Sequence, residues 1–274
     1  MKLRIICFGV FVVFGLNAFS QTLTKQWTTT DGLKTPESVL YDAGSNNIFV
    51  SNINGQASEK DGNGFISILE IDGKMKNLNW VTGLNAPKGL AIYNGNLYVT
   101  DIDELVVINI KEARITDKIK LENAKFLNDV TASEDGTIFV TDMRDNKIYV
   151  LENGKLTLWL EDQSISNPNG LWAENGKLYI GTGQILQADI KTKEIQVLVN
   201  DCGGIDGIEK LKDGNFIYSN WKGLIFITKG VKSIQLLDTV DKQNTADIDF
   251  VPGKNMVLVP TFLANSVEAY LLKP

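Results

Sequence analysis

The sequence predicts an all-β protein, a six-bladed β-propeller with four-stranded antiparallel blades that an N-terminal strand closes. Three observations lead to this prediction. A polar residue before a short apolar strand recurs six times, at spacings of 37 to 51 residues, and a period near 40 residues is typical of propeller blades. Each repeat contains short segments rich in β-branched and aromatic residues, separated by turn dipeptides. The last repeat lacks its fourth segment, whereas a spare segment precedes the first.

The repeated polar residue opens each unit. We predict that it marks the start of the innermost strand of a blade, and that all six of these ring positions therefore face one rim of a central channel. The predicted ring positions are Glu37, Lys88, Asn128, Asn169, Asp206 and Asp247.

The first and second predicted strands of each unit form a hairpin. The first strands cover 39–41, 90–93, 130–132, 170–173, 208–211 and 248–251. The second strands cover 48–50, 97–100, 138–141, 178–180, 216–218 and 256–259. Four of the turns between them carry dipeptides that supply the positive φ of tight hairpins. These are Asn94-Gly95, Asp135-Gly136, Asn175-Gly176 and Asp213-Gly214.

The third and fourth predicted strands complete each unit except the last. The third strands cover 65–69, 105–108, 147–151, 185–188, 224–227 and 267–271. The fourth strands cover 76–80, 116–121, 156–160, 195–199 and 233–237. We expect the spare segment 25–28 to pair with 267–271, which closes the ring and removes two open edges. A β-sandwich is the alternative fold, but the repeats favour a propeller.

The first unit is longer than the others. Residues 51–64 form a polar, glycine-rich insertion between its second and third strands. Such a segment is either a solvated loop or a lid over one face of the propeller. Its Asp61-Gly62-Asn63-Gly64 stretch resembles part of a calcium loop but lacks the closing glutamate.

The N-terminus has the pattern of a signal peptide. Lys2 and Arg4 precede the apolar stretch 5–16, which is too short to span a bilayer comfortably, and a small-x-small site ends at Ser20. We therefore divide the chain into a signal peptide, 1–20, and a propeller, 21–274. Export to the periplasm or the exterior is expected, with no membrane association after cleavage; an uncleaved anchor is the alternative.

Composition excludes several classes of function. The net charge is −6 and the chain has no basic cluster, which argues against nucleic-acid binding. There is no histidine, so neither a Ser-His-Asp triad nor an HExxH zinc site can form. Any metal site must use mainly oxygen ligands, which suit hard cations. Cys202 is the one cysteine left after the predicted cleavage, so no internal disulfide is expected.

Five of the six predicted ring positions carry an acidic or amide side chain. Carboxylates that converge in a confined site repel one another, so that protons or a cation must compensate their charge. Oxygen atoms of Asp, Glu and Asn are also the ligands that Ca²⁺ takes. The arrangement therefore indicates a divalent metal site, although Asp and Asn also commonly cap strand ends and turns.

The motifs around these positions resemble the family of gluconolactonase, regucalcin and luciferin-regenerating enzyme. Glu37 in PESVL, Asn169 in PNGLW and Asp206 in IDGIE match the three metal ligands of that family, and Asn128 in LND matches its third-blade Asn near substrate or metal. The first motif departs from the family's Glu-Gly-Pro. The family's substrate-contacting Arg has no clear counterpart, although Lys125 is nearby.

This resemblance implies a secreted hydrolase that opens a sugar-derived or similar small lactone at one divalent ion. Ca²⁺ is favoured as the ion, with Mg²⁺, Mn²⁺ and Zn²⁺ as alternatives. We expect Asp206 or Asp129 to orient or deprotonate a water. The expected metal ligands are Glu37, Asn169, Asp206 and Asn128. The expected substrate-binding residues are Asn128, Lys88, Arg144, Trp221, Asp247 and Phe262.

Two other functions remain open from the sequence. One is a non-catalytic propeller that binds a ligand or protein partner and keeps the ion as a structural element. The other is an NHL- or YncE-like binding propeller without metal.

Overall fold

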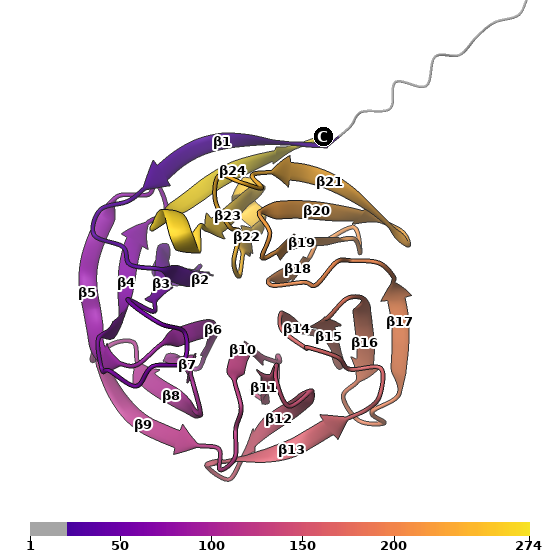
Figure 1. The fold of residues 1–274 in the computed structure, drawn as a ribbon, viewed down its shortest axis with the longest axis horizontal. Coiled ribbons are helices and arrows are strands. Elements are labelled where there is room, and N and C mark those ends of the chain that lie inside the picture. The colour runs from indigo at the N-terminus through magenta and orange to yellow at the C-terminus, as the bar shows by residue number, and fades with distance from the viewer. Residues whose placement is uncertain (1–20) are drawn as a thin grey trace, which may run out of the picture.

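The computed structural model describes residues 21–274, and the predicted signal peptide lies outside them. The chain forms six four-stranded antiparallel sheets arranged as blades around a central channel (Figure 1). In blades I to V the strands follow one another outward from the channel in chain order. The prediction of a six-bladed propeller is therefore confirmed.

The first three blades cover residues 36–161. Blade I consists of β2 (Pro36–Asp42), β3 (Asn47–Asn52), β4 (Gly64–Glu70) and β5 (Met75–Leu84). Blade II consists of β6 (Pro87–Tyr93), β7 (Asn96–Asp101), β8 (Glu104–Asn109) and β9 (Arg114–Lys120). Blade III consists of β10 (Leu127–Ala132), β11 (Ile138–Asp142), β12 (Lys147–Glu152) and β13 (Lys155–Glu161).

Two further blades continue the same pattern. Blade IV consists of β14 (Leu171–Glu174), β15 (Lys177–Gly181), β16 (Ile185–Asp189) and β17 (Ile195–Val199). Blade V consists of β18 (Ile208–Lys210), β19 (Phe216–Asn220), β20 (Leu224–Lys229) and β21 (Lys232–Asp238).

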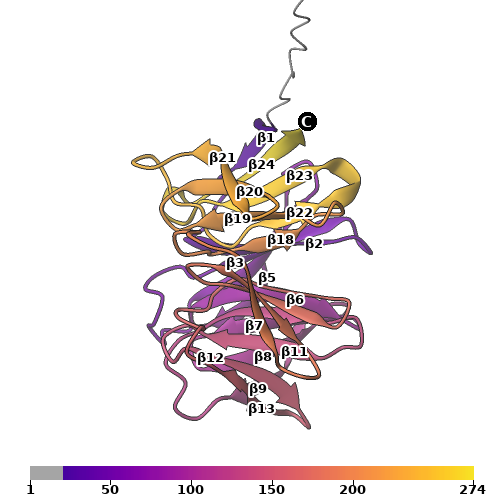
Figure 2. The same cartoon turned by 90° about the vertical axis from the view of Figure 1, so that its right-hand side faces the viewer.

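The two ends of the described chain share blade VI. Its strands, from the channel outward, are β22 (Asp249–Val251), β23 (Met256–Pro260), β24 (Val267–Lys273) and β1 (Thr22–Thr29). β1 runs antiparallel to β24, with Thr22 opposite Lys273 and Thr29 opposite Val267. The two strands lie side by side in both views (Figure 1 and Figure 2). The predicted closure by an N-terminal strand is confirmed. Blade VI also carries two short 3₁₀ helices, η1 (Pro252–Lys254) and η2 (Phe262–Ala264).

The hydrophobic core lies between neighbouring blades. Val50 of blade I and Leu258 of blade VI belong to one buried cluster, and Phe139 of blade III packs in another with Ile180 of blade IV. Facing strands of this kind bury their β-branched and aromatic side chains on both faces of each sheet. Within residues 21–274, no helix is long and apolar enough to cross a membrane.

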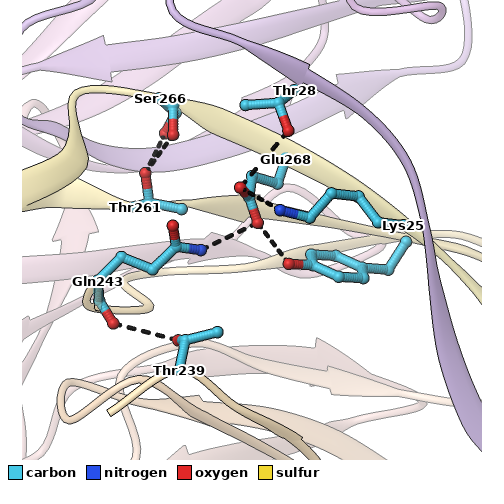
Figure 3. A network of polar contacts seen from close by, with 8 residues as sticks. Lys25, Thr28, Thr239, Gln243, Thr261, Ser266 and Glu268 are labelled. Carbon is cyan, nitrogen blue, oxygen red and sulfur yellow. Dashed lines mark hydrogen bonds and ion pairs between the residues drawn. The ribbon is translucent and has the colours of Figure 1, made fainter. Parts of the chain in front are cut away.

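A buried carboxylate holds the closing strand in place. Glu268 of β24 accepts a hydrogen bond from Lys25 of β1 at 2.6 Å, from Gln243 at 2.9 Å and from Tyr270 (Figure 3). Burial alone would raise the pKa of Glu268, but the hydrogen bonds from Lys25, Tyr270 and Gln243 hold this pKa below its usual value. The ionised carboxylate therefore stabilises the closed ring.

Replacing Glu268 with glutamine is expected to lower the free energy of unfolding by roughly 2 kcal/mol at pH 7, because three donors lose a charged acceptor. Since the folded pKa is depressed, this stabilisation is present above the unfolded pKa of about 4.3 and is lost as the pH falls below it. Urea unfolding at pH 7 and pH 3.5 measures both effects. Glu161→Gln, on the outer strand β13, is the control. A Glu268→Gln variant as stable as the wild type at pH 7 would contradict this role.

Candidate functional site

A β-bulge lies at the start of the inner strand in blades I to III. In blade III, Leu127 pairs with Asp142 and Val130 with Val140, so that Asn128 and Asp129 together oppose the single residue Thr141. The same register shift occurs at Glu37-Ser38 and at Lys88-Gly89. Bulges bend a strand and redirect its side chains, which is how these polar residues come to face the channel.

The residue opposite a bulge supports it with a hydroxyl group. Thr141 Oγ1 accepts a hydrogen bond from the N–H of Asp129 at 2.8 Å. At the corresponding position before the inner strand of blade V, Ser219 Oγ accepts a hydrogen bond from the N–H of Gly207 at 3.0 Å. These bonds satisfy backbone donors that the irregular strand leaves without a ladder partner.

The loop before each of these bulges is anchored by a side chain that sequence reasoning missed. Asp101, at the end of β7, accepts hydrogen bonds from the N–H groups of Asn85 and Ala86 at 2.8 and 2.7 Å. Asp142 does the same for the N–H groups of Lys125 and Phe126 at 2.7 and 2.9 Å. A repeated signal was available in the sequence, because a Ser or Thr followed by Asn or Asp ends the second strand in four blades. These pairs are 51–52, 100–101, 141–142 and 219–220.

The hydrogen-bond register corrects one predicted ring position. The N–H of Asp206 donates to Ser219 O at 2.9 Å, and the equivalent bond in blade VI runs from the N–H of Ala246 to Pro260 O at 3.0 Å. Ala246 is therefore the sixth ring residue, and the prediction that Asp247 occupies that position is wrong by one residue. The segment Asp247-Ile248-Asp249 carries two acidic residues, and the sequence pattern therefore placed a carboxylate at the ring position that Ala246 occupies.

The other five ring residues meet at one mouth of the channel. Glu37, Lys88, Asn128, Asn169 and Asp206 line a cavity of about 650 Å³. The remaining wall residues come from loops above them: Thr35, Ile53, Gly55, Gln56, Ala57, Phe126, Met143, Trp221, Phe262 and Leu263. We call this the ring cavity.

Three oxygen-bearing residues of the ring cavity fit a metal ion. Asn169 Nδ2 donates a hydrogen bond to Asp206 Oδ1 at 2.8 Å, which leaves Asn169 Oδ1 free to accept. Within the described residues, Asn169 Oδ1 and Glu37 Oε2 are buried oxygens without a hydrogen-bond partner. Buried acceptors of this kind are costly unless a ligand or water satisfies them. No group of three or more His, Cys, Asp and Glu side chains in 21–274 is placed to hold a metal, so an ion here would need the amide oxygens.

The electrostatics of the ring cavity also favour a cation. Burial raises the pKa of Glu37, and the carboxylate of Asp206 raises it further. Burial likewise raises the pKa of Asp206 to about 7, against the hydrogen bond from Asn169. Without a cation, burial therefore favours the protonated form of both carboxyl groups.

Lys88 is a buried ammonium group on the same ring. Its side chain is 1% exposed, donates a hydrogen bond to Ala86 O at 2.9 Å, and lies 4.6 Å from the centre of the Phe126 ring. Burial lowers its pKa to about 8, although the charge of Glu37 acts in the opposite direction. Lys88 partly offsets the negative charge of its neighbours.

Asp129 and Asp247 do not line the ring cavity. Together with Glu209 and Asp249 they line a separate cavity of about 260 Å³ further along the channel. Both oxygens of Asp129 accept backbone hydrogen bonds, from Val130 at 2.7 Å and from Leu171 at 2.6 Å. Asp129 thus links blades III and IV, and it lines a different cavity from Asp206.

The inner strands of blades V and VI approach each other closely at Gly207. A Cβ atom on Gly207 would lie 2.3 Å from the backbone nitrogen of Ile248 and 2.5 Å from Asp247 Oδ1. Only glycine fits at this position, because any side chain would collide with Asp247 and Ile248 of the neighbouring strand.

Three residues predicted to bind substrate lie on the rim. Trp221 and Phe262 both line the ring cavity, and their rings meet edge to face at 4.7 Å. Arg144 is exposed and stacks on Phe126, with its guanidinium carbon 4.2 Å from the ring centre. Phe126 therefore lies between the cavity and Arg144.

Comparison with known proteins shows the fold. No family model matches the sequence, and no curated protein does. A streptogramin B lyase superposes with a TM-score of 0.67 at 15% identity, over 92% of this chain and 98% of that one. A protein described provisionally as a gluconolactonase gives 0.65 at 14%, over 93% of both chains. The WD40 propeller domain of Doa1 gives 0.64 at 13%, over 86% and 78%.

Proposed function

We propose that this protein is an exported, metal-dependent hydrolase that opens a small lactone in the ring cavity. The observation that carries the proposal is the pair of buried oxygens without partners, Glu37 Oε2 and Asn169 Oδ1, beside the carboxylate of Asp206. The structural likeness to a provisional gluconolactonase agrees with this proposal at the level of the fold.

Glu37, Asn169 and Asp206 would hold the ion, with Asn128 beside it. When bound, a divalent cation such as Ca²⁺ polarises an ester carbonyl and lowers the pKa of a bound water. Asn128 donates its amide to the sulfur of Met143 at 3.4 Å, which leaves its oxygen free for substrate or ion.

The residues of this chain supply position and charge. Lys88 places a positive charge on the same ring as the carboxylates, where it can stabilise the oxyanion that forms when a lactone carbonyl is attacked. Asp206 accepts a hydrogen bond from Asn169 and is the carboxylate that can orient a water or receive its proton. The ring residues are buried, and burial strengthens these electrostatic interactions.

Lyase chemistry of the kind found in the virginiamycin B lyase is not part of the proposal. A variant of the Staphylococcus aureus lyase with one histidine replaced by alanine is described as catalytically inactive. This chain has no histidine, so it cannot supply that group.

The test is turnover of δ-lactones, followed by pH-stat titration, with and without EDTA, together with elemental analysis of the purified protein. Metal-dependent ring opening supports the proposal. Bound metal without turnover favours the non-catalytic ligand-binding propeller instead. Neither metal nor turnover would overturn the proposal and leave a binding propeller without metal, in which Lys88 and protons compensate the carboxylates.

A further inference from the structure

We infer that the ligand of the ring cavity carries an apolar substituent, aryl or alkyl, on its lactone ring, and is not a sugar lactone. This inference rests on the proposed function and names its class of substrate. The walls of the ring cavity are mostly apolar, whereas the ring residues at its floor are polar or charged.

One wall is built from large apolar side chains that remain accessible. Trp221 follows β19 and is 44% exposed, and Leu263 of η2 is 67% exposed. Phe262 also lines the cavity and makes the edge-to-face contact with Trp221. Exposed apolar groups gathered at the entrance of a cavity are typical of a ligand-binding surface.

The inserted segment of blade I extends this apolar wall. Ile53 is 1% exposed and forms a cluster with Ala86 and Ile102, against which Ala57 and Phe262 pack. An ion pair of 2.6 Å between Lys60 and Asp103 ties the segment to blade II. The sequence allowed either a solvated loop or a lid for residues 51–64. In the structure this segment is a loop that contributes Ile53 and 55–57 to the wall of the ring cavity.

Hydrogen-bonding side chains are concentrated at the floor. They belong to the ring residues Glu37, Lys88, Asn128, Asn169 and Asp206. Above them, the polar groups of the lining residues are those of Thr35 and Gln56 and the indole N–H of Trp221, and the other side chains of the wall are apolar. A polyhydroxylated lactone would bury several hydroxyl groups against this wall without partners, which is unfavourable.

The size of the cavity agrees with a substituted ring. Its volume of about 650 Å³ lies in the range of pockets that hold drug-sized ligands, about 300–1,000 Å³. An unsubstituted six-membered lactone would fill only the floor. The remaining space is bounded by the apolar wall, where burial of a hydrocarbon group is favourable.

The experiment compares δ-valerolactone, δ-octalactone and δ-decalactone with D-glucono-δ-lactone on the metal-loaded protein. We expect kcat/KM to rise about two- to fourfold for each methylene until the cavity is filled, and gluconolactone to be the poorest substrate. Leu263→Ala should lower kcat/KM about three- to tenfold for δ-decalactone and by a smaller factor for δ-valerolactone, whose ring has no alkyl chain to reach this wall. The matched control is Leu158→Ala, an exposed leucine on β13 outside the cavity.

A binding measurement separates this inference from the proposed hydrolysis. The δ-lactams with the same alkyl chains resist hydrolysis, and their binding is followed by the part of the tryptophan fluorescence that Trp221→Phe removes. Lactam affinity that rises with chain length, in a protein that turns over no lactone, would uphold the ligand class and overturn the hydrolase. Turnover of gluconolactone above the alkyl lactones, with lactam binding independent of chain length, would overturn the ligand class.

Discussion

Asp206→Asn is expected to abolish the response of the protein to divalent ions and to lower lactone turnover more than about 100-fold, beyond the loss typical of disturbing an outer-shell partner. The change keeps the size of the side chain and the neighbour Asn169 but removes one of the two carboxylates on the ring. Differential scanning fluorimetry in EDTA and in Ca²⁺ measures the first effect. In the wild type, Ca²⁺ at a hundredfold excess over Kd should add about 2.7 kcal/mol, which corresponds to roughly 5–10 °C in Tm.

Asp247→Asn is the matched control for Asp206→Asn. Asp247 is also an acidic residue at the start of an inner strand, but it lines the second cavity. Its variant should therefore keep the Ca²⁺-dependent gain in Tm and most of the turnover. If both variants lose the response equally, the ion lies deeper in the channel than the ring; if neither does, the three proposed ligands are wrong.

Metal-free protein is expected to be markedly less stable at pH 8 than at pH 5. Burial raises the pKa of Asp129 and of Asp249 to about 7 in the folded protein, whereas the unfolded value is about 3.9. A raised folded pKa contributes stability that is fully present below the unfolded pKa and is lost as the pH rises through the folded one. For one such carboxyl the loss between pH 5 and pH 8 is about 2–3 kcal/mol.

This dependence is measured as Tm in EDTA at pH 5 and pH 8. In Asp249→Asn, the difference between the Tm values at pH 5 and pH 8 should be smaller than in the wild type by roughly 5–10 °C, because asparagine has no charge to bury. Asp135→Asn is the control that should keep the wild-type difference: hydrogen bonds from Ser133 and Thr137 hold the pKa of this exposed aspartate below its usual value, so that it is ionised at both pH values. Equal Tm values for the wild type at both pH values would show that the buried carboxylates are not protonated.

Most of the fold was predictable because turns and strands carry local signals. Asn94-Gly95 and Asn175-Gly176 have positive φ at both residues, as the hairpin dipeptides predict. The closing strand was predictable from a count of strands, because the last repeat lacks its fourth strand and one additional strand precedes the first repeat. Neither argument needs a long-range contact.

The site was only partly predictable, because two consecutive residues in a bulge serve different cavities. Asn128 lines the ring cavity and Asp129 the second one, a separation that a shift of one residue in register decides. Asp247 was predicted at the ring position of Ala246 for the same reason, because the two positions differ by one residue. The apolar wall was predicted only in part. Trp221 and Phe262 were expected to bind substrate and do line the ring cavity, whereas Ile53 and Leu263 were not expected there, because the approach of their loops is set by packing between blades I and VI.

The pairing of β1 with β24 has a consequence for the order of folding. Lys25 and Glu268, which join these strands, are separated by 243 residues in the sequence, and contacts of such separation form slowly because a long loop must close first. Blades I to V each consist of consecutive hairpins and can form from local contacts as the chain emerges. Blade VI cannot, since β24 sits between β23 and β1. Ring closure is then the late step of folding, and hydrogen exchange should find the β1–β24 ladder to be the first part of the ring to open.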